Sequence, residues 1–434
     1  MKLAYLNLGC PKNQVDLETI LGGLVEQTDI VEETNGADTI VINTCAFIES
    51  AKRESIDAIF DIISLKQINP NLKVLVTGCL PQRYKNQIAN LVPEVDQFFF
   101  AVSAESTLTE IQKFLQLPVS RRTPRHLLNP PHYAYLRIAD GCNNRCSYCA
   151  IPLIKGQYQS RPFDEIEQEA LQLAARGVKE IVLIAQDTTY YGADLPIDLS
   201  LENVLTALNE VDGIEWIRLL YTHPAHWSDE LIGTMACLKK VVPYVDIPIQ
   251  HISDPLLQKM GRRVTRAQIE KLVFDIRRRI PDIALRTSII TGFPGETEED
   301  FTELYDFLQE MHFERLGVFT YSHEEDTLAF LYDDDIPESV KLERQRQIMQ
   351  LQDELAEERN ARLIGRVIKV IVDEVDTHNN IAYARSQWDA PEIDGNILLT
   401  DHVLKGEFYN VRIDDAQLYD LTGMVVFEDG TNVC

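Results

Sequence analysis

Three closely spaced cysteines carry the clearest chemistry in the sequence. Cys142, Cys146 and Cys149 stand at positions i, i+4 and i+7 of a stretch that is also rich in Gly and Asn. These residues favour a loop, in which three thiols can converge. Three thiolates hold three corners of a four-iron four-sulfur cube and leave the fourth iron open to a ligand. The alternatives are structural zinc and a disulfide, although zinc sites usually contain two C-x2-C pairs with four ligands.

A second set of three cysteines is spread over the first 80 residues. Cys10, Cys45 and Cys79 each follow an apolar run that predicts a β-strand. The three predicted strands span 2–8, 38–44 and 73–78. Parallel strands end at one edge of an open α/β sheet, where ligands bind, so we expect a second three-thiolate site there. The alternative is three buried small hydrophobic residues.

Strand and helix patterns alternate along most of the chain and predict an α/β multi-domain protein. The predicted domains span residues 1–125, 132–362 and 363–434, and a proline-containing linker covers 121–131. The first domain is predicted to be an open parallel α/β sheet. The second contains six strand-then-helix repeats, which indicate a partial (βα)6 barrel with its chemistry on the loops after the strands. The third changes to period-two alternation, which predicts a small all-β barrel.

Polar residues follow several predicted barrel strands. Gln186, Gln250, Thr291 and Gly292 are candidate cofactor contacts because of this position, and ordinary turn chemistry is the alternative for each. Glycine at such a place lets the backbone approach a ligand closely.

The remaining candidates for metal or thiol chemistry are weaker. His223 and His226 lie three residues apart without an evident third ligand, so they are interpreted as turn or pocket histidines. Cys237 falls in an apolar helical pattern and is predicted to lie in the core, whereas Cys434 is interpreted as an incidental terminal thiol.

The chain of 434 residues is strongly acidic, with 41 Lys or Arg, 68 Asp or Glu and a formal net charge of −27. Such a surface repels nucleic-acid phosphate on average and attracts basic partners, although it also simply aids solubility. The sequence lacks the features of a signal peptide and any run of ~20 apolar residues, so we expect no membrane span and a cytoplasmic location. In that reducing compartment, eight cysteines suggest metal binding or catalysis.

The whole chain resembles the radical S-adenosylmethionine (SAM) methylthiotransferases. The resemblance rests on the motif from Asn7 to Asp16 and on the C-x3-C-x2-C motif within Ala139 to Pro152. Both motifs are similar to the ribosomal-protein branch, the RimO type, more than to the transfer-RNA branch. Residues 386–395 also resemble the motif of that branch's C-terminal TRAM domain, although Gln387 and Trp388 replace small or basic residues.

The resemblance implies two four-iron four-sulfur clusters and SAM as cofactors. Cys142, Cys146 and Cys149 would hold the SAM cluster, while Cys10, Cys45 and Cys79 would hold an auxiliary cluster that carries the sulfur. The implied substrate is a small-subunit ribosomal protein with a target aspartate on a basic loop, and the product carries a methylthio group on the β-carbon of that aspartate. A radical derived from SAM would remove the hydrogen, so no catalytic side chain beyond the cluster ligands is expected. An electron donor is required, and contact with the ribosome is a further expectation.

The predicted third domain carries five Lys or Arg and thirteen Asp or Glu, a local charge of −8. The acidic residues that fit a basic protein partner include Asp389, Glu392, Asp394, Asp414 and Asp415. Two alternatives stay open. One is methylthiolation of a transfer-RNA base, and the other is a non-enzymatic, zinc-stabilised scaffold that recruits ribosomal proteins.

Overall fold

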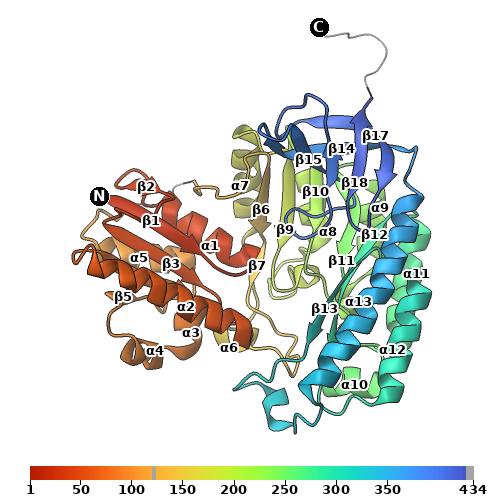
Figure 1. Ribbon diagram of the computed structural model, residues 1–434, viewed down its shortest axis with the longest axis horizontal. Helices are drawn as coiled ribbons and strands as arrows, with labels where there is room; N and C mark the ends of the chain where they lie inside the picture. Colours follow the sequence, from red (N-terminus) through yellow and green to blue (C-terminus); the bar gives the residue numbers. More distant parts are fainter. Residues whose placement is uncertain (120–123, 427–434) are drawn as a thin grey trace. The chain divides into compact units, whose positions relative to one another are not determined.

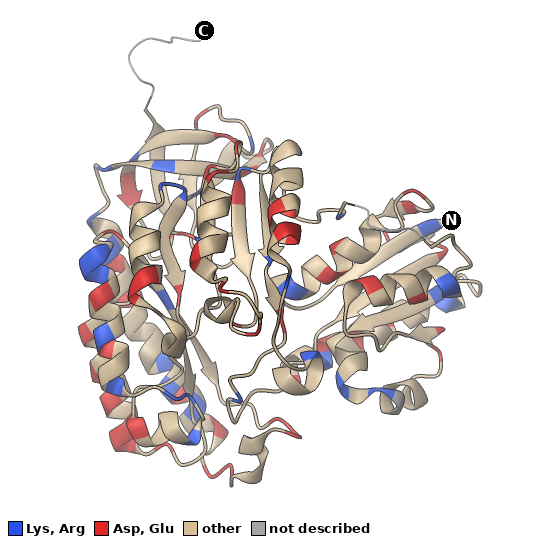
Figure 2. Ribbon diagram, turned by 180° about the vertical axis from the view of Figure 1, so that it is seen from behind, with Lys and Arg blue, Asp and Glu red and all other residues tan. Residues whose placement is uncertain are grey.

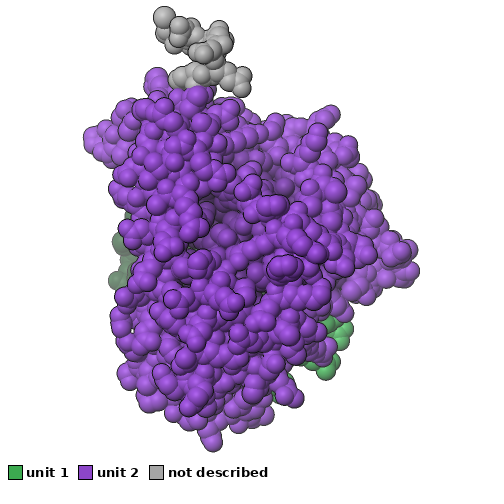
Figure 3. Space-filling model, turned by 90° about the vertical axis from the view of Figure 1, so that its right-hand side faces the viewer, with its two compact units in different colours: residues 1–129, 139–159, 322–330 green, residues 130–138, 160–321, 331–434 purple. Residues whose placement is uncertain are grey.

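The structure, a computed structural model, describes residues 1–119 and 124–426. The chain divides into two compact units, which are coloured separately in Figure 3. Unit 1 contains residues 1–129, 139–159 and 322–330, and unit 2 contains 130–138, 160–321 and 331–434. The first part of the predicted linker, residues 121–123, lies outside the described residues.

Unit 1 is built on a five-stranded parallel sheet with the order β2-β1-β3-β4-β5 (Figure 1). The strands are β1 (Lys2–Asn7), β2 (Asp29–Val31), β3 (Thr39–Thr44), β4 (Lys73–Gly78) and β5 (Gln97–Phe98). The helices are α1 (Pro11–Gly22), α2 (Glu49–Ser64), α3 (Cys79–Tyr84), α4 (Asn86–Leu91), α5 (Ala104–Phe114) and α6 (Ile151–Lys155). Every residue of β3 is buried, as expected for a strand with an apolar core on each face of its sheet. The predicted open parallel sheet is confirmed.

Unit 2 contains a six-stranded parallel sheet with the order β13-β12-β11-β10-β9-β6. The strands are β6 (Tyr133–Arg137), β9 (Glu180–Ile184), β10 (Trp216–Leu219), β11 (Val241–Asp246), β12 (Ala284–Thr291) and β13 (Arg315–Thr320). The helices are α7 (Phe163–Ala175), α8 (Leu201–Asn209), α9 (Asp229–Cys237), α10 (Asp254–Lys259), α11 (Arg266–Arg279), α12 (Glu298–Met311) and α13 (Glu338–Ala361). The sheet runs through six neighbouring strands in chain order, so the predicted partial barrel is confirmed.

Unit 2 also contains a closed barrel of five strands in the order β14-β15-β16-β18-β17. Its strands are β14 (Val367–Asp376), β15 (Ile381–Ser386), β16 (Ile397–Leu399), β17 (Phe408–Ala416) and β18 (Leu421–Val425). All neighbouring pairs are antiparallel except β16 and β18. The predicted small all-β barrel is therefore confirmed, with β18 as an additional strand.

The loop between β15 and β16 attaches this closed barrel to the amino-terminal ends of the sheet strands. Asp389 accepts a hydrogen bond from Arg315, at the start of β13, and Glu392 accepts one from the hydroxyl of Tyr133, at the start of β6. The indole N–H of Trp388 donates to the carbonyl oxygen of Asp282 at 2.7 Å. The closed barrel thus covers the end of the sheet opposite the loops that follow the strands.

These contacts correct one expectation from the sequence. The carboxylates of Asp389 and Asp394 are 5% and 1% exposed and pair with arginines of the sheet, and Glu392 bonds to tyrosines of β6. Asp389 and Asp394 therefore do not present free charges to a basic partner, whereas Glu392 is exposed and stays available to one. Asp414 and Asp415 are exposed, as the expectation requires.

Acidic and basic side chains are interspersed along the helices that flank the six-stranded sheet (Figure 2). Within 1–119 and 124–426, no helix is long and apolar enough to cross a membrane.

Candidate cofactor sites

The N-terminal triad, which consists of Cys10, Cys45 and Cys79, gathers at one edge of the unit 1 sheet. Its members follow β1, β3 and β4, which are neighbours in the sheet. Gly9 has a φ of +100°, and a Cβ atom placed on it would lie 2.9 Å from Cβ of Cys45. Only glycine fits there without strain, so the turn before Cys10 can lie against Cys45.

Asn13 forms hydrogen bonds with the loops that carry this triad. Its Nδ2 donates hydrogen bonds to the carbonyl oxygens of Leu8 at 3.1 Å and Thr44 at 3.0 Å. Its Oδ1 accepts a hydrogen bond from Sγ of Cys79 at 3.4 Å. Sequence reasoning did not single out Asn13, although its position three residues after Cys10, in the first turn of α1, was an available signal.

Burial makes the thiols of Cys45 and Cys79 in the N-terminal triad hard to deprotonate. Burial first, and then the neighbouring Cys10 and Cys45, raise the pKa of the Cys79 thiol to about 12. Burial also raises the pKa of Cys45, again with a contribution from Cys10. A cationic metal group would remove this penalty because it binds the deprotonated form. Three converging thiols of this kind fit an iron-sulfur cluster.

The central triad, which consists of Cys142, Cys146 and Cys149, lies in the loop between β7 (Ala139–Asp140) and α6. The backbone N–H of Cys149 donates to the carbonyl oxygen of Cys146 at 3.1 Å, and that of Asn144 lies 3.5 Å from Sγ of Cys142. Gly141 has a φ of +72°, and a Cβ atom there would lie 2.1 Å from a backbone oxygen of Gln157. Because these contacts coil the loop tightly, three sulfurs separated by only seven residues fit a single cluster.

Both triads belong to unit 1, and they are connected through its core. The segment after Cys149 forms α6, whose Ile154 is buried in the same apolar cluster as Cys79 and Leu80 of α3. The helix that leaves the central triad therefore packs against the helix that begins at the N-terminal triad.

The four predicted cofactor contacts belong to unit 2. Thr291 is the last residue of β12, and the other three follow the ends of strands. Oε1 of Gln186 is buried without a hydrogen-bond partner in the described part of the chain, which leaves an acceptor available for a ligand. Gln250 adopts a φ of +73°, so its backbone departs from the extended conformation at that point.

Thr291 and Gly292 have evident partners within unit 2. The hydroxyl of Thr291 donates to the carbonyl oxygen of Lys341 at 3.2 Å. A Cβ atom on Gly292 would lie 2.2 Å from Cγ of Lys341, so glycine makes room for that side chain. Packing against α13 accounts for both residues, and a role in binding a cofactor stays a prediction.

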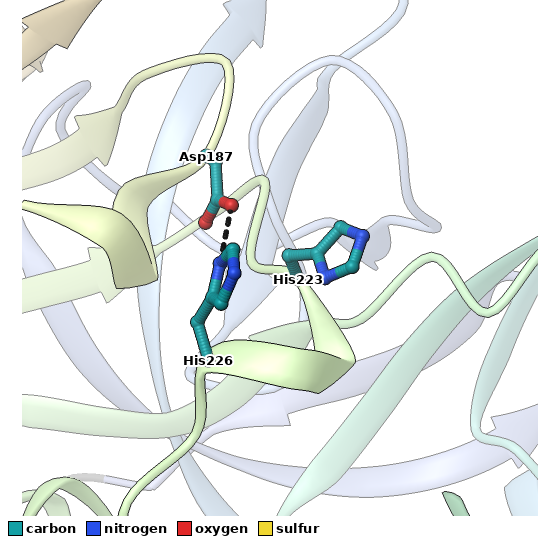
Figure 4. Close-up of side chains that lie close together, drawn as sticks. All are labelled: Asp187, His223 and His226. Atoms are coloured by element: carbon teal, nitrogen blue, oxygen red, sulfur yellow. Dashed lines mark hydrogen bonds and ion pairs between the residues drawn. The ribbon is translucent and has the colours of Figure 1, made fainter. Parts of the chain in front are cut away.

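Three polar side chains converge on the loops after β9 and β10 (Figure 4). Asp187 accepts a hydrogen bond from Nδ1 of His226 at 2.7 Å, and the rings of His223 and His226 stack at 5.0 Å. The potential ligand atoms of the three residues all lie within 4.8 Å of one another. The interpretation that the histidines have no third ligand nearby is therefore wrong. Asp187 directly follows the candidate residue Gln186, just after a predicted strand. This position could have identified it as a site residue.

Hydrogen bonds give the two histidines different roles. An ionised Asp187 only accepts, so Nδ1 of His226 carries a proton and donates it to the carboxylate. Nδ1 of His223 accepts from the backbone N–H of Ala225 at 3.2 Å, so its proton is on Nε2, which is buried without a partner in the described residues. His223 therefore offers a buried donor, while His226 holds the carboxylate of Asp187 in place.

The electrostatics keep His223 and Asp187 in their deprotonated forms. Burial, with a smaller contribution from the guanidinium of Arg262, lowers the pKa of His223 to about 2. Burial alone would raise the pKa of Asp187, but the hydrogen bond from His226 holds it below its usual range. A neutral imidazole and a carboxylate can accept hydrogen bonds or bind a metal ion, whereas the positive charge of Arg262 opposes the binding of a cation.

Cys237 differs from its prediction. It is the last residue of α9 and is exposed, whereas Leu231, Ile232 and Met235 form the buried face of that helix. Cys434 lies outside the described residues.

Three family models match consecutive parts of the chain. Residues 2–100 match the uncharacterized protein family UPF0004, residues 136–308 match the radical SAM superfamily and residues 364–426 match the TRAM domain. The six-stranded sheet and the closed barrel thus correspond to two known domain types.

Curated proteins resemble the chain over nearly its whole length. The ribosomal protein uS12 methylthiotransferase RimO of Geobacter sulfurreducens is 44% identical over 440 residues, which cover 98% of each chain. The protein of the same name from Acetivibrio thermocellus is 44% identical and covers 98% of this chain and 99% of its own.

Solved structures show the same fold at low identity. The radical SAM methyltransferase TsrM of Kitasatospora setae has a TM-score of 0.54 and 16% identity over 73% of this chain and 72% of its own. The cobalamin-dependent radical SAM enzyme OxsB has a TM-score of 0.53 and 14% identity over 80% of this chain and 56% of its own.

Proposed function

The chain belongs to the ribosomal protein uS12 methylthiotransferase family of radical SAM enzymes, and on this premise we propose that it methylthiolates the β-carbon of a loop aspartate in ribosomal protein uS12. The observation that carries the proposal is the coverage of 98% of the chain at 44% identity by relatives that bear this name. The enzyme is a transferase, and SAM and four-iron four-sulfur clusters are its cofactors.

Two sets of cluster ligands are part of the proposal. Cys142, Cys146 and Cys149 hold the SAM cluster, and Cys10, Cys45 and Cys79 hold the auxiliary cluster. When bound, the clusters supply the electron that cleaves SAM reductively and the site that carries the sulfur. The support from this chain is the gathering of the N-terminal triad at one sheet edge and the tight loop of the central triad. Asn13 positions the former, since it bonds both neighbouring loops and Cys79.

Contacts to SAM are assigned to Gln186, Gln250, Thr291 and Gly292. Their common feature is a position at or after the end of a strand of the parallel sheet, where ligands bind in barrels of this type. Gln186 has the strongest support because its buried Oε1 lacks a partner among the described residues.

The domain limits of 1–125, 132–362 and 363–434 belong to the same proposal, with the last domain recognising the substrate. The exposed carboxylates of Asp414 and Asp415 favour a basic protein partner over the phosphates of RNA. An electron donor and contact with the ribosome complete the proposed set of partners, and a cytoplasmic location belongs to the same proposal. Methylthiolation of a transfer-RNA base is not favoured, since the relatives named above are uS12 methylthiotransferases.

The reaction is tested by mass spectrometry after anaerobic incubation of the reconstituted enzyme with SAM and a reductant. Purified uS12 and unmodified transfer RNA are offered as acceptors in separate reactions. We expect a methylthio increment on a loop aspartate of uS12. An increment on the RNA alone would overturn the substrate.

A further inference from the structure

One buried lysine of unit 1 has no place in the function described above. Lys155 is the last residue of α6 and lies six residues after Cys149. Its side chain is 2% exposed, and Nζ lies 2.8 Å from Oδ2 of Asp16. Burial of an ion pair costs desolvation energy for both charges, so stability alone is a weak reason to keep one.

This ion pair lies beside the N-terminal triad. Asp16 follows Asn13 by three residues on α1, which places both on one face of the helix. Asn13 in turn accepts the hydrogen bond from Sγ of Cys79. On the lysine side, the preceding residue Ile154 packs in the apolar cluster that contains Cys79. The ion pair is therefore connected to Cys79 on one side through Asn13 and on the other through the apolar cluster that holds Ile154.

The two charges act on a thiolate at that position in opposite directions, since the ammonium group of Lys155 attracts negative charge and the carboxylate of Asp16 repels it. Three thiolates and an anionic sulfur ligand bring several negative charges into a site of low polarity. A fixed cation nearby offsets part of their repulsion, and its effect is large because little water screens it.

We propose that Lys155 is a positioning residue for the auxiliary cluster, whose buried ammonium group stabilises the negative charge that the N-terminal triad and an anionic sulfur ligand such as hydrosulfide bring together. Asp16 holds the lysine in place and attenuates its charge. The inference rests on the proposed function, because it takes Cys10, Cys45 and Cys79 as cluster ligands. Helix α6, which follows the ligands of the SAM cluster, would thus also contribute Lys155 to the surroundings of the auxiliary cluster.

The test uses the full chain with Cys142, Cys146 and Cys149 replaced by Ala, so that only the auxiliary cluster forms. Lys155→Met and Asp16→Asn are compared in this background by redox titration monitored by electron paramagnetic resonance. Removal of the cation destabilises the more negative, reduced state, so Lys155→Met shifts the midpoint potential downward. Asp16→Asn removes the negative charge beside the ammonium group and shifts the midpoint potential upward.

Titration with sodium hydrosulfide provides a second measurement on the same proteins. We expect hydrosulfide to bind about tenfold more weakly to the Lys155→Met variant, and more tightly to the Asp16→Asn variant. A merely structural ion pair would instead loosen the cluster in both variants, with shifts of the same sign. Shifts of the same sign, or none, would overturn the inference.

Control variants distinguish an effect of the charge of Lys155 from an effect on folding. Lys155→Arg keeps the charge and is expected to retain the parent potential, as is Lys113→Met, which changes an exposed lysine of α5. If Lys155→Met fails to fold because the buried ion pair with Asp16 is broken, the upward shift in Asp16→Asn still decides the question. Absence of iron from the parent background would overturn the proposed ligands and the inference with them, whereas iron with unchanged potentials would overturn the inference alone.

Discussion

Nη1 of Arg286 lies 2.9 Å from Oδ1 of Asp394, and the carboxylate of Asp394 is 1% exposed. The other oxygen accepts hydrogen bonds from the hydroxyl of Tyr244 and the backbone N–H of Ala390, both at 2.8 Å. The acidic residues in this part of the chain therefore have two different roles. Buried carboxylates attach the closed barrel to the sheet, and only the exposed ones are available to a basic partner.

Asp394→Ala is predicted to lower the free energy of unfolding of unit 2 by about 2–3 kcal/mol, because Arg286, whose side chain is 17% exposed, loses its nearest carboxylate and keeps only Asp246 at 3.8 Å. Urea-induced unfolding followed by tryptophan fluorescence measures this change, since all three tryptophans belong to unit 2. Asp414→Ala is the matched control on an exposed carboxylate and should change stability by less than about 0.5 kcal/mol. Equal stability of the two variants would contradict the attachment role.

The exposed carboxylates of Asp414 and Asp415 are predicted to affect the binding of uS12 and not the stability of the fold. A double variant, Asp414→Asn with Asp415→Asn, is predicted to weaken the binding of uS12 at low salt without a loss of stability. The difference from wild type should shrink as salt is added, because the Debye length falls to about 10 Å at 0.1 M. Isothermal titration calorimetry at several salt concentrations measures both affinities. Identical affinities at low salt would argue against electrostatic recognition through these residues.

Removal of one cysteine from each triad should abolish different steps of the reaction. Cys142→Ala is predicted to abolish cleavage of SAM, whereas Cys10→Ala should preserve cleavage and lose transfer of sulfur to uS12. Quantification of 5′-deoxyadenosine and of modified uS12 in the same reactions separates these outcomes. The division of labour is falsified if the Cys10 variant transfers sulfur at the normal rate. Cys237→Ala, which changes an exposed cysteine of α9, serves as the control.

The sequence predicted the parallel sheets well because their strands are apolar runs that end at polar or cysteine residues. It missed β2 and β5, which have only three and two residues, and it missed β18, a short strand interrupted by Gly423. Such segments depend on pairing with neighbours more than on their own pattern. The position of the N-terminal triad followed from strand order alone.

The sites that sequence reasoning missed are formed by residues distant in the chain. Asp394 and Arg286 are 108 residues apart, and Asp389 and Arg315 are 74 apart, so nothing local marks these carboxylates as buried. The wrong prediction that Cys237 lies in the core has a different cause. Its helix already has a buried face formed by residues at helical spacing, and Cys237 lies off that face.

His223 provides a prediction about pH. Burial lowers the pKa of the folded histidine to about 2, while the unfolded chain has the ordinary value of about 6.5. Above that value the residue is neutral in both states and does not affect the pH dependence. As the pH falls below it, only the unfolded chain takes up the proton, so stability is lost progressively with acidification.

His223→Asn should remove this dependence, since the side-chain oxygen of Asn can still accept the hydrogen bond from the N–H of Ala225. Between pH 7 and pH 5, wild type is therefore predicted to lose about 2 kcal/mol more unfolding free energy than the variant. Urea titrations of both proteins at the two pH values, followed by tryptophan fluorescence, give the difference. A gap between the proteins that does not vary with pH would mean that His223 takes up a proton equally in the folded and unfolded states, and would exclude the neutral donor assigned to its Nε2.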